Sequence, residues 1–167
     1  VWIEKALGLG IQEFEIYQST MVEKEMTWFQ GQMDTLVSSK VTGTSIRGIV
    51  DGKMANMALE EIDDSMCETV LKSLIEQAHI ISNEETDSLR KPEPIEYVKK
   101  DVTWNMASTE YVKNILQSLE AKILAYDPRV IQVGYLGYSQ GSGSRSIVNS
   151  LGMDVQDADE MQYIVAS

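Results

Sequence analysis

The sequence is poor in the residues that carry most enzyme chemistry. Its 167 residues include one histidine, one cysteine and three prolines. A single cysteine excludes an intrachain disulfide, and a chain without a disulfide framework is expected in a reducing compartment, so we predict a cytoplasmic protein. A catalytic zinc ion normally has three protein ligands. Because Cys67 precedes His79 by about three helical turns, they are too far apart to share one ion. We predict a surface histidine and a small buried cysteine.

Basic residues and long apolar runs are also scarce. The chain has 26 acidic and 14 basic residues, for a formal net charge of −12. Clustered lysines and arginines are what bind phosphate backbones and anionic lipids, and here the densest group is Arg90-Lys91 followed by Lys99-Lys100. No apolar run reaches the ~18 residues that a membrane span needs. We therefore predict neither a nucleic-acid partner nor a membrane.

The sequence also lacks the structural context that a serine nucleophile, a dinucleotide site or a calcium loop requires. A serine nucleophile would have to use His79 as its base, and we predict that no Gly-x-Ser-x-Gly elbow exists to expose a serine. Gly8-Leu9-Gly10 follows a predicted helix instead of a strand, which excludes a dinucleotide site. The acidic residues Asp154, Asp157, Asp159 and Glu160 lack the glycine and the spacing of a calcium loop, so we interpret them as part of a solvent-facing strand. No catalytic, metal-binding or cofactor-binding residue is assigned, and substrate-binding residues stay unknown.

Apolar and polar residues alternate through much of the first half, as expected for strands with one buried face. Before this region, residues 2–7 predict the end of a helix, with Gly8 and Gly10 as its stop. The first predicted strand covers residues 13–17 and continues with period two through 22–28, until Gly31 breaks the run. Further strands are predicted at residues 33–37, 44–50 and 53–58. Asp51-Gly52 predicts a type I′ turn, which needs positive φ at both residues. The first half therefore predicts a helix followed by an antiparallel meander.

Two longer segments have apolar residues at helical spacing. The first begins with Ser65-Met66-Cys67-Glu68, which matches a capping box, and its stripe is Met66, Val70, Leu74, Ala78 and Ile81. The second covers residues 108–125, and Asp127-Pro128 ends it. Its stripe is Val112, Ile115, Leu116, Leu119 and Ile123. The polar segment 83–94 between them, with two prolines, predicts a surface connection.

The last part of the chain again predicts strands. These cover residues 130–139, 145–148 and 153–165, with a flexible loop at Gln140-Gly141-Ser142-Gly143-Ser144 and a turn at Asn149-Ser150-Leu151-Gly152. The aromatic residues Trp28-Phe29, Trp104, Tyr135 and Tyr138 predict core or interface anchors. The order meander, two long amphipathic helices, meander predicts an α+β fold. Both ends fall within predicted elements, so the fold is expected to be incomplete at both ends, as in a fragment.

Several segments resemble one known family in order and spacing. A strand like Glu13-Phe14-Glu15-Ile16-Tyr17 comes first, followed by a hairpin like residues 43–55 and a helix like residues 70–78. A second helix, its end at Asp127-Pro128-Arg129-Val130 and the turn at residues 149–152 complete the likeness. On these segments nearly the whole chain resembles the N-terminal part of the TldD/PmbA proteins.

The resemblance implies one N-terminal α+β domain, residues 1–167, of a larger cytoplasmic protein, with candidate subdomains 1–82 and 104–167. A C-terminal β-rich domain of the family is absent from this chain. In the TldD branch a His-Glu-x-x-x-His helix binds zinc and hydrolyses peptides, whereas the PmbA branch lacks this motif and acts as a partner subunit. This chain contains no such motif, so no catalytic residue is transferred. No cofactor is expected in this chain, and zinc is expected only in the full-length protein or its partner.

The family is associated with proteolysis, peptide-antibiotic maturation and antitoxin breakdown, and an older label is modulator of DNA gyrase. The resemblance favours the PmbA-like branch here. The chain is then expected to shape a protein complex, either a homo-oligomer or a pair with a TldD-type subunit, that admits extended peptide. Whether the full-length protein is a metallopeptidase or its non-catalytic partner stays open. The alternative is a non-enzymatic α+β scaffold or a ligand-binding module.

Overall fold

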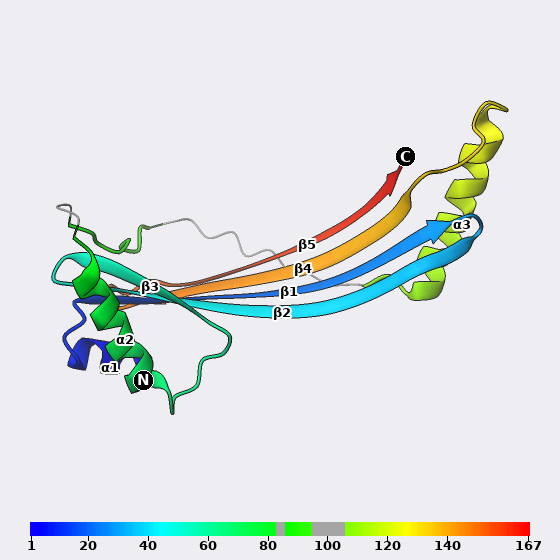
Figure 1. The fold of residues 1–167 in the computed structure, drawn as a ribbon. Helices are drawn as coiled ribbons and strands as arrows, with labels where there is room; N and C mark the ends of the chain where they lie inside the picture. Colours follow the sequence, from blue (N-terminus) through cyan, green and yellow to red (C-terminus); the bar gives the residue numbers. More distant parts are fainter. Residues whose placement is uncertain (83–85, 95–105) are drawn as a thin grey trace. The chain divides into compact units, whose positions relative to one another are not determined.

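The computed structural model describes residues 1–82, 86–94 and 106–167. In chain order the elements are α1 (Trp2–Gly8), β1 (Glu13–Phe29), β2 (Gln32–Val50), β3 (Lys53–Leu59), α2 (Cys67–Ile80), α3 (Thr109–Tyr126), β4 (Leu136–Asn149) and β5 (Asp154–Ala166). The five strands form an antiparallel sheet in the order β3-β2-β1-β4-β5 (Figure 1). Strands and helices are segregated along the chain, which confirms the predicted α+β class. Trp104, Lys99-Lys100 and part of the predicted connection, residues 83–85, lie outside the described residues.

The chain divides into two compact units, and each contains its own hydrophobic core. Unit 1 consists of Val1–Thr20, Thr42–Lys99 and Ser144–Asp157. Unit 2 consists of Met21–Val41, Lys100–Gly143 and Ala158–Ser167. Strands β1, β2, β4 and β5 contribute residues to both units, so neither unit is continuous in sequence.

In unit 1, helices α1 and α2 supply the apolar layer that packs on the sheet. Phe14 of β1 and Ile46 of β2 are fully buried in one cluster with Leu71 and Leu74 of α2. The helix lies close against the sheet at Gly48, where a Cβ would lie 2.9 Å from Leu74 Cδ2. The buried residues of α2 follow the predicted helical spacing: Cys67, Val70, Leu71, Leu74 and Ala78. Only the first residue of the predicted stripe, Met66, is exposed.

In unit 2, helix α3 packs on strands β1 and β4. Met26 and Trp28 of β1 are buried in one cluster with Val112 and Leu116 of α3. This burial confirms the period-two pattern predicted for this part of β1 and the stripe predicted for α3. Ser108 is the N-cap of α3, where its side chain accepts a hydrogen bond of 3.2 Å from the backbone N–H of Tyr111.

Two tight turns of the same kind connect β1 to β2 and β2 to β3. Asp51 and Gly52 have φ angles of 49° and 74°, as predicted for a type I′ turn. Beyond this turn the pairing runs from Val50↔Lys53 to Thr44↔Leu59. Gln30 and Gly31 have φ angles of 49° and 79°. Gly31 therefore ends the β1 run, as predicted, by allowing a turn that leads directly into β2.

The predicted breaks in two strands are wrong, because the chain stays extended through both. Residues 33–37 and 44–50 belong to one strand, β2, whose residues 32–38 are all exposed. Where both faces of a strand meet water, burial does not constrain the side chains, so the alternation that marks a strand is weak. The predicted loop at residues 140–144 likewise lies inside β4, and the predicted strand at 130–139 begins only at Leu136.

The capping box predicted for α2 is also wrong. The helix begins at Cys67, and no side chain caps it. Instead, Asp63 Oδ1 accepts a hydrogen bond of 2.8 Å from the backbone N–H of Ser65, and the Asp63 carbonyl accepts one of 3.1 Å from that of Met66. The hydrogen bond from Ser65 holds the pKa of the Asp63 carboxyl below its usual value. A turn closed by an aspartate therefore precedes the helix. Glu68, the other residue of the predicted capping box, instead forms an ion pair with Lys72 at 2.7 Å.

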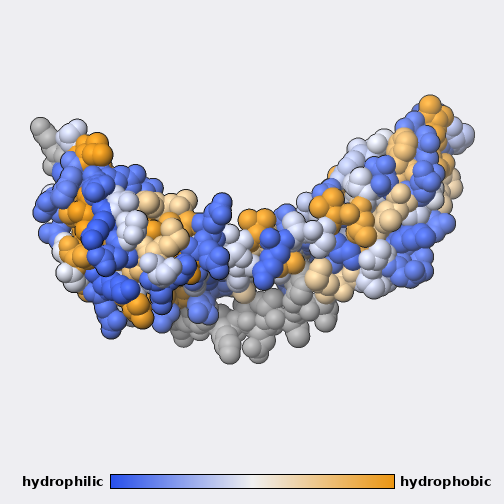
Figure 2. Space-filling model, turned by 60° about the horizontal axis from the view of Figure 1, so that its bottom comes forward, coloured by the Kyte–Doolittle hydropathy of each residue, from blue (hydrophilic) through white to orange (hydrophobic). Residues whose placement is uncertain are grey.

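The edge strand β5 is open to solvent. All thirteen of its residues are exposed, and they include apolar side chains at Val155, Met161, Tyr163, Ile164 and Val165. On the face shown in Figure 2, hydrophobic residues form separate patches among hydrophilic ones. A strand at the edge of a sheet presents unpaired N–H and C=O groups that can pair with another strand.

Candidate functional site

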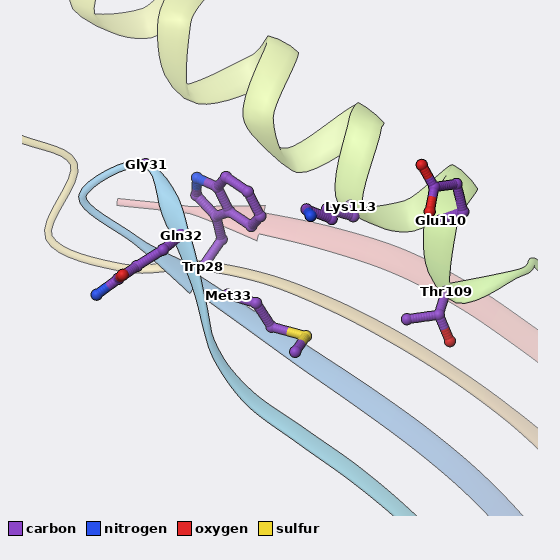
Figure 3. Close-up of a pocket in the computed structure, with 7 residues that line it drawn as sticks. All are labelled: Trp28, Gly31, Gln32, Met33, Thr109, Glu110 and Lys113. Atoms are coloured by element: carbon purple, nitrogen blue, oxygen red, sulfur yellow. The ribbon is translucent and has the colours of Figure 1, made fainter.

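A pocket in unit 2 is the candidate site. It has a volume of about 520 Å³ and lies between the β1–β2 hairpin and the first turns of α3 (Figure 3). Its size falls within the range of about 300–1,000 Å³ that is typical of small-molecule sites. The lining residues are Trp28, Gly31, Gln32, Met33, Thr109, Glu110 and Lys113.

The apolar wall of the pocket is held in place by a buried carboxylate. Glu120 Oε2 accepts hydrogen bonds from Trp28 Nε1 at 2.7 Å and from the backbone N–H of Gly31 at 3.0 Å. Trp28 and Glu120 are both buried, at 3% and 8% exposure. The indole N–H is therefore satisfied inside the protein, and the ring offers the pocket only apolar surface. Met33 adds a partly exposed thioether side chain.

The charged groups of the pocket come mainly from α3. Lys113 is exposed, and its side chain extends from the helix toward the indole of Trp28 (Figure 3). Glu110, one turn earlier on the helix, is also exposed, and it lines the pocket at the end near Thr109 (Figure 3). At the edge of the pocket, Lys24 Nζ donates a hydrogen bond of 2.8 Å to Thr109 Oγ1. The Lys113 ammonium therefore lies on the side of the pocket next to Trp28, whereas Lys24 and the Glu110 carboxylate lie at the Thr109 end.

A second hollow, of about 330 Å³, lies in unit 1. Its central feature is an ion pair between Arg47 and the buried carboxylate of Glu15, with Arg47 Nη2 and Nε at 2.6 and 2.7 Å from Glu15 Oε1. Asn149 Nδ2 donates to the other oxygen of Glu15 at 3.1 Å and also to the carbonyl of Arg90 at 3.0 Å. The Glu15 carboxylate compensates the charge of the Arg47 guanidinium. Through Asn149, the same network connects strand β1 to residues 86–94.

Cys67 and His79, the candidates for a nucleophile and a metal ligand in the sequence, line neither hollow. Cys67 is fully buried in the core of unit 1, and burial raises the pKa of its thiol. His79 lies on α2 with its side chain 57% exposed, and its Nε2 is 3.5 Å from Asp51 Oδ2 across the β2–β3 turn. A lone imidazole beside one exposed aspartate matches a surface ion pair better than a metal site.

Residues 154–160 are exposed along β5, so the predicted solvent-facing acidic strand is observed. Within the ranges 1–82, 86–94 and 106–167, no three His, Cys, Asp or Glu side chains are grouped closely enough to hold a metal ion. In the same part of the chain, no helix combines the length and the apolar character needed to cross a bilayer.

Residues 137–141 have the Gly-x-Ser-x-Gly spacing of a hydrolase nucleophile. They lie inside β4, however, whereas that motif works on a sharp turn from a strand into a helix. At the first glycine of the motif, Gly137, a Cβ would meet the hydroxyl of Tyr135, whereas at Gly141 it would make an ordinary contact of 3.5 Å with the carbonyl of Val22. Ser139 is therefore a strand residue and not an activated nucleophile.

The sequence interpretation missed the residues that shape the pocket. Glu120 follows Leu116 by four residues on the apolar stripe of α3, so helical spacing alone placed this carboxylate on the buried face. A charged residue at such a position indicates an internal partner. Lys113 gives no comparable signal, because an exposed lysine on a helix has no distinguishing pattern.

Two successive segments match family models. Residues 14–82 match the PmbA/TldA metallopeptidase domain 1, and residues 103–167 match the PmbA/TldA metallopeptidase central domain. No curated protein sequence shows significant similarity to the chain.

Solved structures share the fold at low sequence identity. A candidate modulator of DNA gyrase from Thermotoga maritima has a TM-score of 0.78 at 17% identity, with 99% of this chain and 37% of that protein covered. TldE from Thermococcus kodakarensis has a TM-score of 0.78 at 19% identity, with 98% of this chain and 38% of TldE covered. A second candidate modulator of DNA gyrase, from Bacteroides thetaiotaomicron, has a TM-score of 0.74 at 17% identity and covers 99% and 38%. The chain thus spans less than two fifths of the length of these proteins. With both family models matched in succession, this chain belongs to the PmbA/TldD family.

Proposed function

We propose that this chain is an architectural part of a cytoplasmic PmbA/TldD-family protein that takes part in proteolysis or peptide maturation. In this proposal the chain shapes a complex that admits extended peptide, and the peptide bond is cleaved elsewhere in the complex. The family models, both described as metallopeptidase domains, support a role in peptide handling. Zinc would belong to the rest of the full-length protein or to a partner subunit.

The edge strand β5 is the observation that carries the proposal. It is the last strand of the sheet and is exposed at every residue. The backbone groups on its outer edge suit another strand, contributed by the rest of the full-length protein, by a second subunit or by an unfolded peptide. Main-chain pairing does not depend on the side chains of the added strand, so such an edge accepts many sequences.

The proposal also includes the PmbA-like branch, in which the protein acts with a TldD-type subunit or as a homo-oligomer. The turn at residues 149–152 and the strand that follows it support this choice, together with the link around residues 84–94, of which 84 and 85 lie outside the described residues. Direct contact with DNA is not part of the proposal, because a net charge of −12 repels a phosphate backbone.

A peptide-cleavage assay with the full-length protein tests this function. The protein is incubated with an unfolded fluorescent peptide, alone and with a TldD-type subunit, and each reaction is repeated with a chelator. We expect cleavage only in the mixture, with loss on chelation and recovery when zinc is restored. Chelator-sensitive cleavage by the full-length protein alone would overturn the partnership. A mixture that neither associates in gel filtration nor cleaves peptide would overturn the role itself.

The pocket beside Trp28 favours a second candidate function, a non-enzymatic ligand-binding module on an α+β scaffold. A hollow with one apolar wall and an exposed ammonium group matches the usual architecture of a small-ligand site. Saturable binding of a small ligand by a protein that neither cleaves peptide nor associates with a TldD-type subunit would favour this alternative.

A further inference from the structure

The pocket of unit 2 combines three features that the hydrophobic core does not require. It is a cavity of about 520 Å³, its apolar wall is fixed, and an ammonium group reaches into it. The double hydrogen bond from Trp28 and Gly31 to Glu120 keeps the wall in one position. A ligand that packs against this wall therefore loses little affinity to reorganisation of the protein.

The positive charge in the pocket is available to a ligand. Within the described residues, Lys113 has no hydrogen-bond or ion-pair partner. The other nearby ammonium, Lys24, is bonded to the Thr109 hydroxyl, which leaves its positive charge at the pocket edge. Next to the indole, an incoming anion would meet the opposite charge of Lys113, and the Glu110 carboxylate lies at the other end of the pocket.

The apolar wall limits which anionic ligands can bind in the pocket. Trp28 and Met33 offer no polar atom to a ligand, because the indole N–H is already engaged by Glu120. A polyphosphate or a sugar phosphate would lose hydration against this wall without compensating hydrogen bonds. A single carboxylate attached to an apolar group matches both halves of the pocket, with the charge at Lys113 and the apolar group on Met33 and the small exposed part of the indole.

We propose that this pocket binds a carboxylate joined to an apolar side chain. The C-terminal residue of a peptide that ends in phenylalanine or leucine has this chemistry, and so does a free N-acylated amino acid. The inference follows from the pocket alone and does not rest on the proposed role in peptide handling.

Calorimetric titration of the full-length protein tests this site with four probes. N-acetyl-phenylalanine and its amide differ only in the carboxylate, and the tetrapeptide acetyl-Ala-Ala-Ala-Phe is used in the same two forms. We expect both acids to bind at least about tenfold more tightly than their amides, since a charge-assisted hydrogen bond is lost in the amide. If N-acetyl-phenylalanine binds and the tetrapeptide acid does not, the ligand is a small molecule. If the tetrapeptide acid also binds, the pocket accepts the C-terminus of a peptide.

Two variants locate the binding. Lys113→Gln keeps the length of the side chain but removes its charge, and it should weaken binding of the acids about tenfold while leaving the amides unchanged. Lys122→Gln, an exposed lysine on the same helix outside the pocket, is the matched control and should leave all four affinities within twofold of the original. Equal affinity for acid and amide, an equal loss in both variants, or no saturable binding of either acid would overturn the proposal.

Discussion

Trp28 Nε1 donates a hydrogen bond of 2.7 Å to Glu120 Oε2, which joins strand β1 to helix α3 inside the core of unit 2. The same oxygen accepts the backbone N–H of Gly31 at 3.0 Å, so one carboxylate fixes both the strand and its turn. Substitution Glu120→Ala removes the acceptor of the buried indole N–H and of the N–H of Gly31, a residue that is exposed. A buried unsatisfied donor costs about 1–3 kcal/mol, whereas water can replace Glu120 at Gly31, so we expect a loss of about 1–3 kcal/mol in unfolding free energy.

Urea unfolding followed by circular dichroism measures this loss. Gln117→Ala, an exposed change on the same helix, is the control and should stay within about 0.5 kcal/mol of the original protein. Glu120→Gln keeps one side-chain oxygen as an acceptor and should fall between the two. Equal unfolding midpoints for Glu120→Ala and Gln117→Ala would show that the buried hydrogen bonds contribute nothing to stability.

The ion pair of unit 1 gives a second prediction. Arg47 is 44% exposed, but Glu15 is only 2% exposed, so Arg47→Met leaves a buried carboxylate whose remaining polar partner is Asn149. Breaking a fully buried pair costs about 3–5 kcal/mol, and the partial exposure of Arg47 lowers our expectation to roughly 2–4 kcal/mol. The double variant Glu15→Gln, Arg47→Met removes the uncompensated charge and should recover part of the loss. Additive effects of the two single changes in a double-mutant cycle would contradict this coupling.

The buried thiol gives a prediction on reactivity and pH. Burial raises the pKa of Cys67, chiefly because the thiolate would be desolvated. We expect Ellman's reagent at pH 8 to react slowly with the folded protein and rapidly after unfolding in urea, because only the exposed thiolate is nucleophilic. Rapid stoichiometric reaction of the folded protein would show that the thiol is accessible.

The raised pKa of Cys67 also determines in which direction the stability of the protein changes with pH. The unfolded state, with an ordinary thiol pKa of about 8.5, loses its proton before the folded state does. The contribution of Cys67 is therefore fully present below about pH 8.5 and is lost as the pH rises toward the folded pKa. Cys67→Ala should show a smaller alkaline loss of stability than the original protein. Tyr135 and Tyr138, whose pKa values burial also raises, are retained in both proteins, so the difference isolates the thiol.

Sequence patterns predicted the elements whose two faces meet different environments. The stripe of α3 and the alternation that ends at Trp28 were readable because each element buries one face and exposes the other. The Asp51-Gly52 turn was readable because positive φ at both positions restricts the residues that fit. In these places local preference and tertiary packing agree, which is why the α+β order followed from the sequence.

The failures have two physical causes. In β2 and β4 the pattern is interrupted by polar and glycine residues, yet pairing with neighbouring strands keeps the backbone extended through 32–50 and 136–149. Tertiary hydrogen bonds of this kind override local preference. The pocket was missed because it depends on Trp28, Met33 and Lys113, which come from three elements or element ends and share no local motif.

The last prediction concerns Gly52, which has a φ of 74°. A side chain here is strained by the backbone, and a Cβ would also lie 3.2 Å from Thr86 Cγ2. The backbone N–H of Gly52 donates to Gln12 at 3.1 Å and its carbonyl accepts from Asp87 at 2.9 Å, so the turn cannot relax without losing these contacts. We expect Gly52→Ala to lower the unfolding free energy by about 1–2 kcal/mol, the usual cost of a left-handed conformation for an L-residue.

Gly8 provides the matched control for Gly52. It is the last residue of α1, its φ lies outside the left-handed region, and a Cβ there would meet nothing within 4 Å. The same change, Gly8→Ala, reduces the freedom of the unfolded chain without straining the fold, so it should raise stability by up to about 1 kcal/mol. The two variants thus differ in sign although the chemical change is identical. Urea midpoints that move in the same direction would show that backbone conformation does not decide the effect, and that the turn at residues 51–52 tolerates ordinary negative φ.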